Sequence, residues 1–98
     1  MAFYVYILRC ADGSYYAGHT DNLEARLAVH RTGALRGYTY SRRPVRVVFR
    51  QQFLSRDEAF MAERQIKGWS RRKKEALIWG DWSSLRRLSQ PHRSTGSS

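Results

Sequence analysis

The apolar residues of this chain gather in short runs separated by turn and helix-capping residues. Residues 3–9 (Phe-Tyr-Val-Tyr-Ile-Leu-Arg) are aromatic, β-branched or apolar, which predicts a strand. Ala11-Asp12-Gly13 is a turn signal, and residues 14–18 return as a second, short strand. Residues 45–49 predict a third strand, which starts directly after Pro44. The first two strands are therefore expected to form an antiparallel hairpin.

Helical segments account for most of the remaining chain. The first two helix starts have the spacing of a capping box, Asp21 with Glu24 and Ser55 with Glu58. The predicted helices cover roughly residues 22–32, 55–67 and 70–80. Residues 33–43 are rich in Gly, Tyr and Arg without periodicity, and we expect a loop there.

The predicted order of elements, β-β-α-β-α-α, is that of a small α/β (α+β) domain. Ninety-eight residues provide for one hydrophobic core, so we expect one domain over residues 1–88. Trp69, Trp79 and Trp82 are interpreted as core and helix anchors, with Trp82 in a last helical turn. Residues 89–98 contain no apolar side chain and are predicted to form a disordered tail.

The charge of the chain points to a polyanionic partner. The chain carries 18 Lys and Arg against 8 Asp and Glu, a formal net charge of +10, and its 42% hydrophobic content excludes a disordered polycation. No acid stands between Glu24 and Asp57, or from Arg64 to Lys74. Such stretches suit a nucleic-acid backbone, although the second could simply be a solvated helix face. The expected contacts are Arg42, Arg43, Lys67, Arg71, Arg72, Lys73 and Lys74.

Cysteine usage and the start of the chain indicate the compartment. Cys10 is the single cysteine, which excludes an internal disulfide, and we expect it to be a small buried hydrophobe. The first ten residues lack the basic leader of a signal peptide and the long apolar run of a membrane span. We expect a cytoplasmic monomer with no membrane association and no small-molecule cofactor.

The residues that suggest chemistry cluster in the first third of the chain. Tyr4-Val5-Tyr6 lies on the first predicted strand, and Tyr16-Ala17-Gly18 lies on the second. Arg26 and His30 are four residues apart and therefore share one helix face. Far downstream, Glu63 stands between basic residues of the second helix and could equally form an ordinary ion pair there.

This combination resembles the GIY-YIG nuclease superfamily over roughly residues 3–88. The two tyrosine-containing tripeptides correspond to its signature, and the similarity continues through His19-Thr20 and Lys67-Gly68-Trp69. The resemblance implies a central three-stranded antiparallel sheet flanked by helices, and hydrolysis of DNA phosphodiester bonds with one divalent metal, Mg²⁺ or Mn²⁺. It also implies a phosphate contact at His19, where excision-repair relatives often carry lysine.

The resemblance assigns roles to five residues by position. Tyr6 and Tyr16 correspond to the paired active-site tyrosines, Arg26 to the phosphate-binding arginine and His30 to the helix residue beside it. Glu63 corresponds to the metal ligand, and a hard cation that keeps most of its waters needs only one such carboxylate. A phenol is a poor base at neutral pH. Its pKa is expected to fall beside a metal and Arg26, so that Tyr16 could deprotonate the attacking water or act through Tyr6, and the sequence leaves the two roles open.

A shared tyrosine site makes a specific prediction about the hairpin. A two-residue loop would direct Tyr6 and Tyr16 to opposite faces of the sheet. A three-residue loop, with Gly13 in the left-handed conformation, pairs Cys10 with Ser14 instead. This register places three tyrosines on one face: Tyr4, Tyr6 and Tyr16. We therefore predict the three-residue loop, with Tyr4 as a half-buried packing residue.

One departure from the family pattern keeps a second function open. Several nuclease members carry an asparagine beyond the metal-binding glutamate, whereas Asn22 is the only asparagine of this chain. The first hypothesis is a metal-dependent DNA nuclease. The alternative is a basic nucleic-acid-binding module with little or no catalysis on the same scaffold, and a third, more distant one is an RNA- or ribosome-associated protein.

Overall fold

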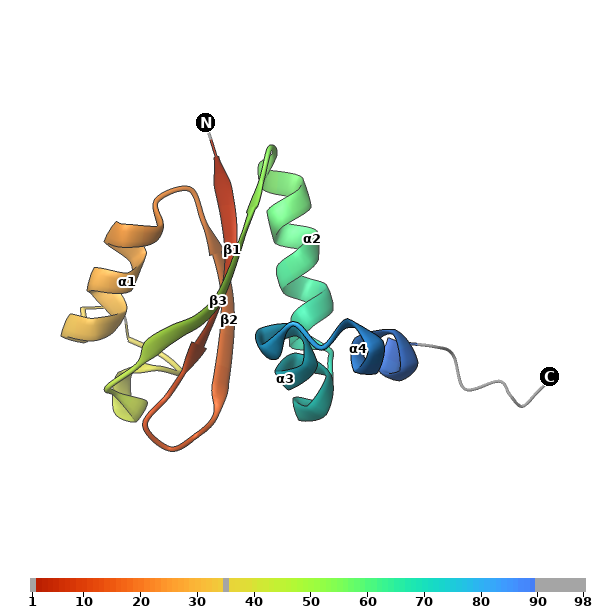
Figure 1. Ribbon diagram of the computed structural model, residues 1–98. Coiled ribbons are helices and arrows are strands. Elements are labelled where there is room, and N and C mark those ends of the chain that lie inside the picture. Colours follow the sequence, from red (N-terminus) through yellow and green to blue (C-terminus); the bar gives the residue numbers. More distant parts are fainter. Residues whose placement is uncertain (1, 35, 90–98) are drawn as a thin grey trace. The chain divides into compact units, whose positions relative to one another are not determined.

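The computed structural model describes residues 2–34 and 36–89 (Figure 1). The chain divides into two compact units, Met1–Gly68 and Trp69–Ser98. The first unit contains the sheet and two long helices, and the second contains the last two helices. No helix in the described ranges has the length and apolar content that crossing a bilayer requires.

A three-stranded antiparallel sheet forms the centre of the first unit, as predicted. Its strand order is β2-β1-β3, built from β1 (Phe3–Arg9), β2 (Tyr15–Thr20) and β3 (Arg46–Phe53). Central strand β1 is buried on both faces from Val5 to Leu8. Strand β3 extends four residues beyond the predicted end at Phe49, because its polar second half pairs with β1 although it lacks the apolar pattern that marks a strand.

The hairpin between β1 and β2 has the predicted three-residue loop. Gly13 has a φ of +85°, and its N–H donates to the Cys10 carbonyl at 2.9 Å. The Cys10 N–H donates to the Ser14 carbonyl at 2.9 Å. Tyr6 lies opposite Gly18 and Leu8 lies opposite Tyr16, so the register is confirmed. The two tyrosines of the signature therefore belong to one face of the sheet.

Helix α1 (Leu23–Thr32) begins one residue later than predicted. The side chain of Asn22 accepts a hydrogen bond from the Ala25 N–H at 3.1 Å and forms the N-cap. The prediction that Asp21 caps this helix is wrong, because Thr20 Oγ1 accepts from the Asn22 N–H and holds the asparagine in the capping position. Asp21 instead forms an ion pair with Arg56, with 3.5 Å between Asp21 Oδ2 and Arg56 Nη2.

Helix α2 (Arg56–Lys67) begins at the predicted N-cap, Ser55, whose hydroxyl accepts from the Glu58 N–H at 3.1 Å. Figure 1 shows α1 and α2 on opposite sides of the sheet. The predicted loop between α1 and β3 contains one short 3₁₀ turn, Tyr40–Arg42.

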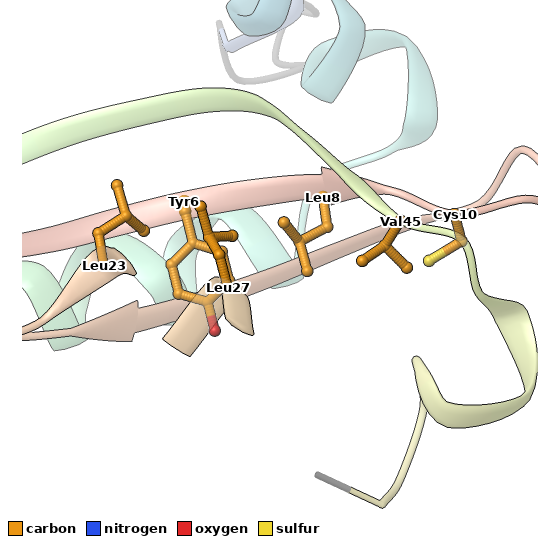
Figure 2. Packing of buried hydrophobic residues seen from close by; sticks show 6 residues of the cluster. All are labelled: Tyr6, Leu8, Cys10, Leu23, Leu27 and Val45. Atoms are coloured by element: carbon orange, nitrogen blue, oxygen red, sulfur yellow. The ribbon is translucent and has the colours of Figure 1, made fainter. Parts of the chain in front are cut away.

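The face of the sheet toward α1 carries a buried cluster that includes a tyrosine of the signature. Its members are Tyr6, Leu8, Cys10, Leu23, Leu27 and Val45 (Figure 2). Tyr4 and Tyr16 pack against this cluster and are only partly buried, which confirms the prediction for Tyr4. Cys10 is a buried free thiol, also as predicted.

The second unit contains α3 (Arg71–Trp79) and α4 (Trp82–Ser89). Ser70 caps α3 and Gly80 ends it with a φ of +69°, as expected, but the predicted last turn is a full helix. Trp79 and Trp82 are 70% and 56% exposed, so the interpretation of these two residues as core anchors is wrong. The predicted tail lies outside the described residues except for Ser89, which ends α4.

Candidate active site

Tyr6 is the central residue of the candidate site. Its side chain is fully buried, and its hydroxyl lies 3.0 Å from His30 Nε2. The tyrosine ring occupies the space above Gly18, the residue opposite it on β2. A Cβ at position 18 would lie 2.6 Å from Tyr6 Cζ, which no side chain tolerates. Gly18 of the second tripeptide is therefore needed to leave room for the ring of Tyr6 from the first tripeptide.

His30 links Tyr6 to the loop that follows α1. His30 is 1% exposed, and its Nδ1 lies 2.8 Å from the hydroxyl of Thr39, which is also buried. Burial, and then the charge of Arg26, lowers the pKa of His30, so its ring is neutral at pH 7. Thr39 was missed at the level of sequence, because a threonine in an aperiodic Gly- and Arg-rich loop has no signal of burial.

Arg26 lies close enough to Tyr6 to hydrogen-bond its hydroxyl. A neutral imidazole has one N–H and one acceptor nitrogen, so His30 donates to one of the two hydroxyls, that of Tyr6 or that of Thr39, and accepts from the other. Burial, and then the neighbouring Tyr16, raises the pKa of Tyr6 to about 12, even though Arg26 opposes this shift. Desolvation therefore outweighs the nearby cation at Tyr6, and the lowering of a tyrosine pKa beside a bound metal stays a prediction.

Tyr16 approaches the same group from β2. Its ring meets the His30 ring edge-on, with 5.4 Å between centroids, and stacks on Tyr38 at 5.9 Å. The ammonium nitrogen of Lys67 lies 5.4 Å from the centre of the Tyr16 ring. Unlike Tyr6, Tyr16 remains partly accessible to solvent.

Glu63 reaches the site from α2, on the other side of the sheet. His19 alternates with Gly18 on β2 and so points toward α2, where its Nδ1 lies 2.5 Å from Glu63 Oε1. Lys67 Nζ lies 2.8 Å from Glu63 Oε2. Burial disfavours the Glu63 carboxylate, but the hydrogen bonds from His19 and Lys67 outweigh it and hold the pKa of Glu63 below its ordinary value. Because Lys67 also faces Tyr16, it connects the two sides of the site around edge strand β2.

The kind of metal ion that the site could bind depends on the side chains that could serve as its ligands. Within residues 2–34 and 36–89, no group of three or more His, Cys, Asp or Glu side chains converges. Glu63 is an ionised, partly buried carboxylate and fits a hard cation that retains most of its water ligands. In the structure, both of its oxygens already contact cationic or donor groups, His19 and Lys67. A bound cation would therefore compete with Lys67 for Glu63.

The remaining residues predicted to contact nucleic acid lie in several places. Arg42 pairs with Asp12 at 3.1 Å and covers the Tyr38 ring, while Arg43 covers Tyr40. In the second unit, Arg71 pairs with Glu75 at 3.1 Å. The other members of that stretch, all on α3, are Arg72, Lys73 and Lys74.

The fold and this cluster of side chains define the class of protein. The family model of the GIY-YIG catalytic domain matches residues 2–76, and the chain belongs to this family. The domain provides a nuclease-like scaffold and implies a nucleic-acid substrate, and the family typically uses a divalent metal.

Among its relatives are small proteins of the group called UPF0213. A UPF0213 protein of Bacillus pumilus is 44% identical over 75 residues, which cover 76% of each chain. UPF0213 protein SH2523 of Staphylococcus haemolyticus is 47% identical over 76% of this chain and 92% of its own. The solution structure of UPF0213 protein BH0048 from Bacillus halodurans has a TM-score of 0.54 at 40% identity, and covers 93% of this chain and 100% of its own.

Proposed function

We propose that the chain is a divalent-metal-dependent nuclease that hydrolyses phosphodiester bonds in DNA. The observation that carries this proposal is the convergence of Tyr6, Tyr16, Arg26 and His30 on one face of the sheet, with Glu63 linked to Tyr16 through Lys67. A structural ion pair alone would not require two tyrosines, a histidine and an arginine beside it.

The side chains divide the work of hydrolysis. Arg26 is the only one of them that carries a permanent positive charge, and it would hold the scissile phosphate. Burial raises the pKa of Tyr6 to about 12, which favours its protonated form, so Tyr6 would act as a hydrogen-bond donor. Tyr16, which is partly exposed, would be the base and can act only as the phenolate: it would take a proton from the attacking water as the water oxygen bonds to phosphorus, while the bond from phosphorus to the leaving oxygen breaks and that oxygen takes a proton from solvent. Bound at Glu63, a divalent cation supplies neutralisation of phosphate charge.

Cleavage of plasmid, single-stranded and branched DNA with Mg²⁺, and with EDTA, tests this proposal. We expect cleavage only with the metal, and we expect Glu63→Gln and Arg26→Ala each to reduce its rate by at least about a hundredfold. Glu58→Gln is the matched control, because it makes the same change on the same helix and glutamine still suits the capping position. Equal rates in wild type and Glu63→Gln would contradict the proposal.

One observation favours a second candidate, a nucleic-acid-binding domain without catalysis. Lys67 already neutralises Glu63, so the carboxylate forms a complete ion pair without a metal. In that case both wild type and Glu63→Gln would bind DNA and neither would cut it. The cleavage experiment therefore separates the two candidates directly.

A further inference from the structure

Two tryptophans of the second unit face solvent. Trp79 is 70% exposed and Trp82 is 56% exposed. They lie on either side of Gly80, which ends α3 in the left-handed conformation. Both lie beyond residue 76, where the match to the family ends, and neither has a role in the proposed hydrolysis. Large exposed aromatic side chains that the fold does not use typically mark a binding surface.

The charge around these tryptophans indicates an anionic ligand. Residues 69–89 contain two acids and six basic residues, which are Arg71, Arg72, Lys73, Lys74, Arg86 and Arg87. Helix α4 itself carries the last two and no acid. Arg86 follows Trp82 by four residues, so the guanidinium and the indole share one face of α4.

A groove of about 160 Å³ lies between α3 and α4 and could hold the ring of a nucleic-acid base. It is bordered by the apolar side chains of Trp79 and Leu88, and also by the carboxyl groups of Glu75 and Asp81. Carboxylates repel phosphate but accept hydrogen bonds from the amino groups of bases. The groove is therefore better suited to a base than to the backbone, whose phosphates are expected at Arg86.

The third tryptophan of this unit, Trp69, is not free to stack on a base. It is only partly exposed, and the ammonium nitrogen of Lys73 lies 4.3 Å from the centre of its ring. The face of this indole is already covered by a cation. Stacking on a base is therefore expected at Trp79 and Trp82 and not at Trp69.

We propose that Trp79 and Trp82, together with Arg86 and Arg87, form a contact surface for unpaired bases of single-stranded nucleic acid. The proposal rests on the nucleic-acid substrate proposed above. An exposed indole can stack only on a base that has left its own duplex stack, which favours single strands over double strands. The arginines supply the charge that follows the backbone.

Fluorescence anisotropy of a labelled 12-nucleotide oligothymidylate, in EDTA and in the Glu63→Gln background, measures this binding without cleavage. We expect Trp79→Ala and Trp82→Ala each to weaken affinity about fivefold or more, and the Phe substitutions to retain most of it. Arg86→Ala and Arg87→Ala should each lower the slope of affinity against salt by about 0.7. Leu54→Ala removes an apolar side chain that is 85% exposed in the first unit and should leave affinity unchanged.

Unchanged affinity in both alanine variants, with their helical content intact by circular dichroism, would overturn the proposal. It would also be overturned if these variants altered the sedimentation coefficient but not oligothymidylate binding, because the surface would then join copies of the chain. The outcome is independent of the nuclease proposal. If binding depends on the tryptophans but the wild type does not cleave DNA, the nuclease proposal is rejected and the proposed contact surface stands. If the wild type cleaves DNA but binding does not depend on the tryptophans, the contact surface is rejected and the nuclease proposal stands.

Discussion

Each unit of this chain has a characteristic pair of aromatic residues, and the two pairs lie in opposite environments, buried for Tyr6 and His30 and exposed for Trp79 and Trp82. In the first, Tyr6 and His30 are almost completely buried, and hydrogen bonds connect Tyr6 to His30 and His30 to Thr39. In the second, Trp79 is largely exposed to solvent. Buried polar groups keep one geometry because an unmade hydrogen bond is costly there, whereas an exposed ring can adapt to a ligand. The comparison agrees with the two proposals, chemistry that needs fixed geometry in the first unit and adaptable ligand contact in the second.

The largest expected effect on stability comes from position 18. Gly18→Ala places a Cβ against the buried ring of Tyr6, and we expect it to lower the free energy of unfolding by about 2–3 kcal/mol. Urea denaturation measures the change. Gly68→Ala is the matched control, because the nearest atom to its Cβ would be 3.6 Å away and its φ is −83°. A Gly18→Ala variant as stable as Gly68→Ala would show that the ring of Tyr6 is not held against β2.

The link between His30 and Thr39 should have a smaller effect. Thr39→Val removes the buried hydroxyl and leaves His30 Nδ1 without its partner, which should cost about 1–2 kcal/mol in urea denaturation. Thr39→Ser keeps the hydroxyl and should recover most of this loss. If valine and serine give the same stability, the hydroxyl does not hold the histidine.

The pH dependence of stability tests whether His30 is buried as a neutral ring. Its pKa is lowered on folding, so the unfolded chain takes up the proton more readily, and stability falls as the pH decreases through and below about 6.5. We expect the free energy of unfolding to decrease from pH 7.5 to 5.5, with a flatter profile in His30→Gln. Glu63, whose pKa is also lowered, adds a further loss below about pH 4.5. Parallel profiles for wild type and His30→Gln would contradict the burial of a neutral ring.

The smallest effect on stability is expected in the second unit. Trp79→Ser and Trp82→Ser should change the free energy of unfolding by less than about 0.5 kcal/mol, because both side chains are exposed. Thermal unfolding followed by circular dichroism measures it. A loss as large as that of Gly18→Ala would mean that these rings are packed, and the contrast between the two units would disappear.

Much of the fold follows from local sequence. The turn at Gly13, the caps at Ser55 and Ser70 and the register of the hairpin were all predicted, because each depends on residues that are close in the chain. The cap of α1 was predicted one residue early, because Asp21 and Asn22 both suit the position and only the hydroxyl of Thr20 selects between them.

The sequence by itself therefore determined most of the elements, the placement of the two tyrosines on one face of the sheet and the family to which the chain belongs. Only the tertiary structure decided which groups surround those residues: Thr39 at His30, and His19 and Lys67 at Glu63. It also decided that burial raises the pKa of Tyr6 and that Trp79 is exposed. The physical reason is that burial and charge depend on side chains that are distant in sequence, and no local pattern records their approach.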